Sequence, residues 1–177
     1  LKKVGTVSVD GTKIQANASK HSAVSYKRAG EQIELLSKEV EQLMVKAEQA
    51  DSTPLDDGLS IPDEIVRRKD RISRLKEARR IIEQRDKEAK QSKYDEKTAK
   101  REAQRKAGKK PKGPEPKKPK STPDDKKQYN FTDPESRIMK AGSGEHFEQA
   151  YNAQAAVDTD SYMIVGRYVT DASNDKE

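Results

Sequence analysis

The stretch VGTVSVDGTKIQANAS, residues 4–19, sets the expected plan of the chain. A short run of β-branched residues ends at Val9 and favours an extended strand. Asp10 and Gly11 follow at once, and Asp-Gly is a pair typical of turns. We therefore expect Asp10 where a strand ends or kinks, with its carboxylate directed out of the edge of a sheet. Taken alone, such a short motif is more often an ordinary turn than a functional site.

The composition indicates a chain that is only partly packed. Of its 177 residues, 31% are hydrophobic and 38% are charged, whereas globular domains have roughly 45–50% apolar and about 25% charged residues. Lys and Arg outnumber Asp and Glu by 37 to 31, which favours an anionic partner, although so modest an excess can simply keep a chain in solution. The absence of Cys excludes disulfides and thiol chemistry. Because no apolar run approaches the roughly 18 residues of a membrane span, we expect a cytoplasmic protein with no membrane partner.

Residues 21–107 are predicted to form a helical hairpin. A first helix from residue 22 to about 50 and a second from about 62 to 106 each carry apolar residues at heptad-like spacing. Ser60 and Asp63 predict a capping box at the start of the second helix. After Ala89 the apolar seam fades, so we expect a frayed end. The seam residues are Ile33, Leu36, Val40, Leu43 and Ala47, then Ile65, Ile72, Leu75, Ile82 and Ala89. This stripe predicts packing and no cofactor.

Residues 108–128 follow as a basic linker. The segment GKKPKGPEPKKPKSTP, residues 108–123, holds five of the eight prolines and predicts an extended, solvated and disordered chain. Its lysines could contact the phosphates of DNA or RNA, or the segment could be a soluble spacer, and the sequence alone leaves both open. The lysines concerned are Lys109, Lys110, Lys112, Lys117, Lys118 and Lys120.

Residues 129–177 are predicted to return to a sheet. The run at 163–170, MIVGRYVT, has the composition of a strand, while 147–157, FEQAYNAQAAV, suits strand or helix. Asp158 and Asp160 lie between them and are expected to be solvated turn residues. A β-hairpin over 151–170 should pair with the strand at residues 4–14. The expected fold is α+β, with a sheet of about three strands interrupted by the helical hairpin and the linker.

With these segments in order, the chain resembles insertion-sequence transposases of the DDE type. The segments that carry the similarity are VGTVSVDGTKIQANASKHSAVSY, NFTDPESRIMK and YNAQAAVD, with a trailing VT and NDKE. The resemblance covers most of the chain and implies an RNase H-like catalytic core. In that family the Asp of the DGT segment, here Asp10, ends the first core strand and is the first of three acidic residues that bind Mg²⁺ or Mn²⁺. The second Asp and the Glu have no matching motif here, so the resemblance implies the N-terminal part of such a domain (residues 1–20 holding the first strand).

The resemblance also implies a substrate and a reaction. The intact enzyme would bind the ends of an insertion sequence and its target DNA, act as a homo-oligomer at the nucleoid, and transfer strands with two metal ions. Because Asp10 alone can hold Mg²⁺ only weakly, this chain by itself is expected to lack transposase activity. Lys13 and Lys20 are weaker candidates for contacts with the DNA backbone, and Asn152 and Gln154 are weak candidates near the site.

Two other interpretations remain from the sequence. The chain could be a non-enzymatic module whose basic helices bind nucleic acid, or an inactive transposase remnant. The strands expected at both ends of the chain argue against a purely helical binding module, which needs no sheet.

Overall fold

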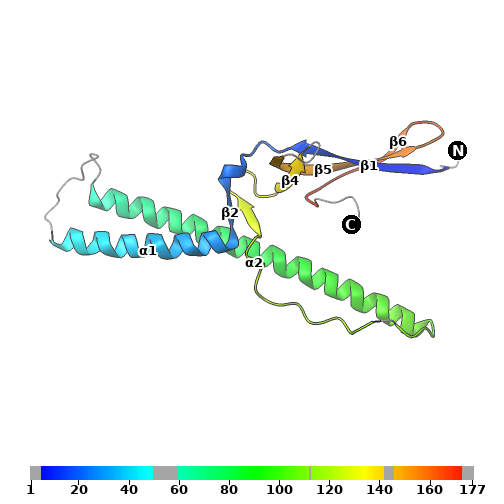
Figure 1. The fold of residues 1–177 in the computed structure, drawn as a ribbon, viewed down its shortest axis with the longest axis horizontal. Coiled ribbons are helices and arrows are strands. Elements are labelled where there is room, and N and C mark those ends of the chain that lie inside the picture. Colours follow the sequence, from blue (N-terminus) through cyan, green and yellow to red (C-terminus); the bar gives the residue numbers. More distant parts are fainter. Residues whose placement is uncertain (1–4, 50–59, 112, 142–145, 173–177) are drawn as a thin grey trace. The chain divides into compact units, whose positions relative to one another are not determined.

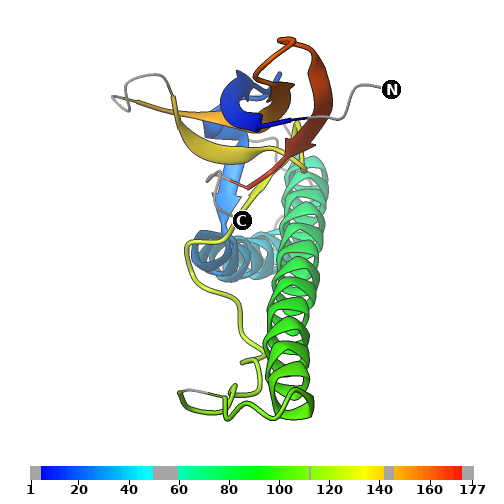
Figure 2. The same ribbon diagram turned by 90° about the vertical axis from the view of Figure 1, so that its right-hand side faces the viewer.

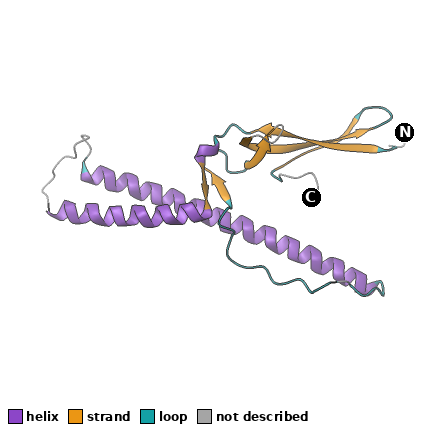
Figure 3. Ribbon diagram, viewed as in Figure 1, coloured by secondary structure: helices purple, strands orange, loops and turns teal. Residues whose placement is uncertain are grey.

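The computed structural model describes residues 5–49, 60–111, 113–141 and 146–172. Contacts divide the chain into two compact units, which are described separately. The helical unit is Ser25–Tyr129, and the sheet unit combines Leu1–Val24 with Asn130–Glu177. The architecture is α+β, with two long helices and antiparallel sheets, as the sequence predicts (Figures 1 and 3).

The sheet unit is built around one long strand, β5 (His146–Asp158). β1 (Val7–Gln15) pairs with β5 along one side, while β4 (Arg137–Ala141) and β6 (Ile164–Thr170) share the other side, and all pairs are antiparallel. The predicted hairpin and its pairing with the N-terminal strand are therefore confirmed, and the ambiguous segment is a strand. The expected number of strands was too low, because β4 makes a fourth strand of this sheet.

The predicted end or kink of the strand at Asp10 is wrong. β1 runs without interruption, and Asp10 and Gly11 pair with Ala155 and Gln154 near its middle. Gly11 does not adopt a positive φ. Nine consecutive cross-strand pairs thus outweigh the local turn preference of Asp-Gly, because each pair adds backbone hydrogen bonding and side-chain contact.

Little of the sheet unit is buried. Met139 and Asn152 are its largest fully buried side chains. Val9 on β1, with 64% of its surface exposed, and Tyr168 and Val169 on β6, with 64% and 60%, remain open to solvent. Because neighbouring residues of a strand point to opposite faces, Tyr168 and Val169 expose apolar surface on both faces of the sheet.

The helical unit consists of α1 (Tyr26–Gln49) and α2 (Ile61–Lys106). The first predicted helix begins four residues late, because Lys20–Ser22 form a 3₁₀ turn and Ala23–Ser25 form the short strand β2. β2 pairs with β3 (Gln128–Asn130) where the chain passes between the units. Buried residues of the helical unit include three predicted seam positions, Val40, Leu75 and Ile82, together with Ala29 and Ala78.

Polar contacts show that the two helices run antiparallel, as predicted (Figures 1 and 2). The start of α1 meets the middle of α2, where the Tyr26 hydroxyl donates to Glu83 at 2.7 Å and Arg79 lies 4.3 Å from the centre of the Tyr26 ring. Further along α1, Glu39 accepts from Arg68 at 2.9 Å. Among the described residues, no helix is both long and apolar enough to cross a membrane.

Both ends of α2 are capped. The Ser60 hydroxyl accepts from the Asp63 amide at 3.3 Å, which confirms the predicted cap. The expected frayed C-terminal end is wrong: the Gly108 amide donates to the Arg105 carbonyl at 3.0 Å, and the Lys109 amide donates to the Gln104 carbonyl at 2.9 Å. Gly108 has φ 72°, the left-handed conformation that this Schellman motif requires. The motif reverses the chain at the end of the helix.

Candidate functional site

The sheet places Asp10 in a row of side chains that crosses three strands. Asp10 of β1 pairs with Ala155 of β5, and Ala155 pairs with Arg167 of β6. Directly paired residues share a face, so the carboxylate and the guanidinium lie on the same face with only an alanine methyl between them. Two strand spacings separate their backbones by roughly 10 Å. Both side chains are exposed.

An open hollow on the three strands includes this row. Asp10 and Thr12 of β1, Ala153 and Ala155 of β5 and Arg167 of β6 are among its lining residues. The alanines leave the surface between Asp10 and Arg167 low. The guanidinium of Arg167 is therefore open to an anionic group such as a phosphate.

The described residues supply only part of a divalent-cation site. Asp10 accepts a hydrogen bond from the Gly11 amide at 2.8 Å through one carboxylate oxygen. No group of three or more His, Cys, Asp or Glu side chains suited to a metal ion occurs in the described part of the chain. One carboxylate fits a first ligand of Mg²⁺, which is commonly held by one or two carboxylates with water and phosphate oxygens. It does not complete a two-metal centre.

The other residues singled out near Asp10 are not on its face. Lys13 pairs with Asn152, and Gln154 pairs with Gly11, so all three side chains alternate to the opposite face of the sheet. Asn152 is buried, with 1% of its surface exposed. Lys20 is exposed in the 3₁₀ turn after β1. The structure therefore does not bring these candidates to the Asp10 carboxylate.

Arg167 is the residue of this row that sequence reasoning missed. It lies 157 positions after Asp10 in the numbering of the chain, and its run MIVGRYVT indicates only a strand. The pairing register was the missing information: once Asp10 is set opposite Ala155 and Ala155 opposite Arg167, the two charges share a face.

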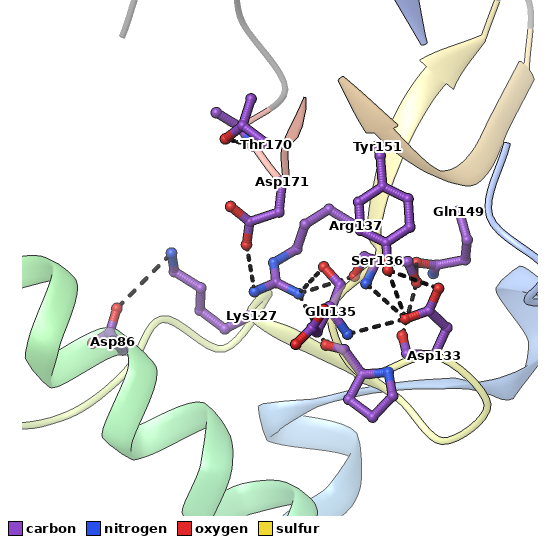
Figure 4. Close-up of polar contacts among 12 residues, drawn as sticks. Asp86, Lys127, Asp133, Glu135, Ser136, Arg137, Gln149, Tyr151, Thr170 and Asp171 are labelled. Carbon is purple, nitrogen blue, oxygen red and sulfur yellow. Dashed lines mark hydrogen bonds and ion pairs between the residues drawn. The ribbon is translucent and has the colours of Figure 1, made fainter. Parts of the chain in front are cut away.

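A polar clamp fixes the loop before β4 onto β5 (Figure 4). The Tyr151 hydroxyl lies 2.8 Å from each carboxylate oxygen of Asp133, and the Ser136 hydroxyl contacts the Gln149 side chain at 3.0 Å. Burial, and then the hydrogen bond to Asp133, raise the pKa of Tyr151 to about 12. Arg137 also pairs with Asp171 at 2.7 Å, which joins the start of β4 to the end of β6. These contacts explain a structural role for all six polar residues.

The β5–β6 turn is stabilised by an aspartate that sequence analysis expected to be solvated. Asp158 is instead buried, with 8% of its surface exposed, and accepts from the hydroxyl and the amide of Ser161. The Ser161 hydroxyl hydrogen bond is the largest cause that holds the pKa of Asp158 below its usual value. Asp160, by contrast, is exposed as expected.

The helical unit holds a second candidate site, which we call the basic arm: residues 85–127, comprising the C-terminal half of α2 and the segment that follows it. The basic arm has 17 Lys and Arg residues against 8 Asp and Glu, whereas the whole chain has a net charge of +6. All of the excess positive charge therefore lies in the arm. Of the six lysines of this segment that are candidates for nucleic-acid contacts, five are described and exposed, namely Lys109, Lys110, Lys117, Lys118 and Lys120, while Lys112 lies outside the described residues.

The basic segment has no helix or strand between residues 108 and 127 where it is described, as predicted, and three side chains of α2 contact it. Arg101 donates to the carbonyls of Gly113 and Pro114 at 3.2 and 3.0 Å. Arg105 pairs with Glu115 at 2.9 Å, and Lys90 donates to the Thr122 carbonyl at 2.8 Å. The segment consequently runs back along α2 (Figures 1 and 2).

Comparison with protein-family models, with curated proteins and with solved structures gave no match.

Proposed function

We propose that this chain is the N-terminal part of the catalytic domain of a DDE-type transposase, with Asp10 as the first of its metal-binding carboxylates. The proposal rests on the sequence resemblance and on an RNase H-like interpretation of the sheet. The observation that carries it is the row of Asp10, Ala155 and Arg167, because it presents an exposed carboxylate on a paired strand beside a cation. The pairing of β1 with the β5–β6 hairpin, which the same interpretation required, supports it further.

The residues of the row have separate roles in this proposal. Asp10 would contribute an oxygen ligand to Mg²⁺ or Mn²⁺, and the bound ion would activate a nucleophile for attack on a DNA phosphodiester. Arg167 would hold a non-bridging oxygen of the phosphate, since a guanidinium presents paired donors that suit phosphate geometry. Ala155 keeps the space between them open. The remaining carboxylates are expected from protein sequence outside the described residues.

The test is DNA cleavage by the protein made from the complete reading frame that contains this chain. Asp10→Asn should abolish Mg²⁺-dependent cleavage of DNA carrying the element's ends, because the amide removes the anionic ligand while keeping the shape of the side chain. Asp160→Asn, which changes an exposed turn carboxylate, is the matched control and should cleave normally. Full activity of Asp10→Asn would overturn the proposal. The claim that three carboxylates are required would be overturned if residues 1–177 alone nicked DNA in the presence of divalent ions and Asp10→Ala abolished that nicking.

A second candidate function is nucleic-acid binding without catalysis. The charge distribution favours it, because the helical unit has 29 Lys and Arg against 21 Asp and Glu, whereas the sheet unit has 8 against 10. A binding module of this kind would retain DNA affinity in Asp10→Asn and would show no cleavage in the wild type. An inactive remnant of a transposase would behave in the same way in the cleavage assay.

A further inference from the structure

The basic arm differs from a freely solvated run of charges because hydrogen bonds and ion pairs hold the segment that follows α2 against that helix. Its contacts pair early positions of the helix with late positions of the returning segment: Lys90 with Thr122, Arg101 with Pro114, and Arg105 with Glu115. Near the base of the arm, Asp86 is buried at 6% exposure and forms an ion pair with Lys90 at 2.5 Å. It forms a second ion pair with Lys127 at 3.9 Å (Figure 4). Together these contacts hold an otherwise irregular chain in register along the helix.

A polar stripe of α2 faces the returning segment. Lys90, Tyr94, Thr98 and Arg101 are each half-buried, while most of their neighbours on α2 are exposed. Their spacing of three or four residues places them on one face of the helix. Because Lys90 and Arg101 both contact the returning segment, that segment passes over this stripe. The apolar seam that ends near Ala89 is thus replaced by a polar docking face.

The returning segment separates its prolines from its lysines. Pro111, Pro116 and Pro119 are half-buried and Pro123 is buried. The lysines between and beside them are exposed, and within the described residues the side-chain ammonium groups of Lys109, Lys110, Lys117, Lys118 and Lys120 form no hydrogen bond or ion pair. Four of the five prolines therefore lie toward the protein, whereas Pro114 and the lysine ammonium groups are exposed to solvent. Pro also limits the backbone freedom of the segment, which reduces the entropy lost when the lysines bind a partner.

We infer that the basic arm is a preformed surface for the phosphate backbone of duplex DNA. Residues 86–106 of α2 extend for roughly 30 Å, close to the length of one turn of duplex DNA, about 34 Å. Lysines set along that length can meet successive phosphates without reading bases, and such contacts release counterions. This inference deepens the proposed function by naming a DNA contact distant in sequence from Asp10.

The first experiment compares two variants that remove the same charge from different places. One replaces Lys109, Lys110, Lys117, Lys118 and Lys120 with Gln. The control replaces Lys27, Lys38, Lys46, Lys69 and Lys76 with Gln, which are exposed lysines elsewhere in the helical unit. Binding of the chain to fluorescein-labelled duplex DNA is measured by anisotropy over a range of NaCl concentrations, without divalent ions. The arm variant should lower the slope of log K against log salt by about 4, and the control by less than about 1.

Equal losses in the two variants would overturn the inference, because net charge alone would then explain binding. Absence of measurable binding by the wild type would also overturn it. Duplex RNA and a polyglutamate peptide serve as competitors: tighter binding of either one would contradict the assignment to DNA. Binding is measured without divalent ions and cleavage by Asp10→Asn is measured with them, so a failure of this inference is distinct from a failure of the catalytic proposal.

The second experiment tests whether pinning matters. Asp86→Asn removes a buried anion from the base of the arm and makes the chain more positive by one charge. If charge alone set the affinity, DNA binding would become tighter. If the arm is preformed, binding should instead become weaker, by about threefold or more, because in Asp86→Asn the segment must become ordered when it binds the DNA. Affinity that is equal or tighter, in a variant whose circular dichroism shows intact helices, would overturn the preformed surface.

Discussion

The helical unit and the sheet unit of this chain bury their residues in different ways. In the helical unit, apolar side chains of α1 and α2 meet along one seam, and charged residues cover the outside. In the sheet unit, apolar side chains of β1 and β6 remain exposed and two of the largest fully buried side chains are Met139 and Asn152. Charge is therefore not what keeps a region unpacked, because the more charged unit has the more regular core.

The largest effect should come from the seam of the helical unit. Leu75 has only 2% of its surface exposed. The Leu75→Ala substitution should lower the free energy of unfolding by about 3 kcal/mol, because a buried cavity adds to the lost transfer free energy. The measurement is urea unfolding followed by circular dichroism at the helical band. Leu35→Ala, at an α1 position with 57% exposure, is the matched control. A similar loss in both variants would mean that the seam is not the core of the unit.

The next effect should distinguish the two units. Met139 has only 1% of its surface exposed, and Met139→Ala should lower the free energy of unfolding by about 2 kcal/mol. Amide hydrogen exchange should become faster in β5, while the amides of α2 should remain protected. Met163→Ala, at a position with 67% exposure, should leave both protected. Loss of protection in both units from Met139→Ala would show that they unfold together and would break the comparison.

A smaller effect is expected where α2 ends. Gly108→Ala forces a β-carbon into a left-handed conformation and should cost about 1 kcal/mol. Gly108→Asn should cost less, since Asn tolerates that conformation better. Thermal unfolding gives the stability, and limited proteolysis between residues 108 and 127 reports whether the segment leaves α2. If both variants match the wild type in both measurements, the chain reversal does not depend on this cap.

The smallest effect at neutral pH concerns Tyr151. Its pKa is raised to about 12, through burial first and the Asp133 hydrogen bond second. Because the pKa of Tyr151 is higher in the folded protein than in the unfolded chain, the protonated hydroxyl stabilises the fold. This stabilisation is complete below the unfolded-state pKa, near 10, and is lost as the pH rises toward 12. Ultraviolet titration should show a tyrosine with a late transition that disappears in Tyr151→Phe and moves to lower pH in Asp133→Asn. A wild type that lacks the late transition, or a Tyr151→Phe variant that keeps it, would contradict the clamp.

The features that could be predicted from sequence are those fixed by local periodicity. The two helices follow from the spacing of their apolar residues, and the hairpin follows from the strand composition around Asp158. β4 was missed because RIMKA is only five residues long and has no clear alternation. At Asp10, nine cross-strand pairs outweighed a two-residue turn signal.

The site features that could not be predicted depend on contacts between distant residues. Asp10 was identified through its motif, but its neighbour Arg167 depends on the register of three strands. The pinning of the basic segment depends on Arg101 meeting backbone carbonyls, which any residue type supplies and no motif reveals. Gly108 was the one sequence signal for this arrangement, since a glycine just beyond a helical pattern indicates that the helix is capped and that the chain reverses direction there.

The most direct test of the proposed transposase is the reading frame itself. The DNA on both sides of this coding segment should be sequenced. The account predicts that codons after residue 177, in frame or through a frameshift, supply an Asp following a strand and a Glu on a helix, which would complete the carboxylate set begun by Asp10. A frame that closes there, with no such acidic residues encoded nearby, would contradict the account and leave salt-dependent DNA binding by the basic arm as the activity to measure.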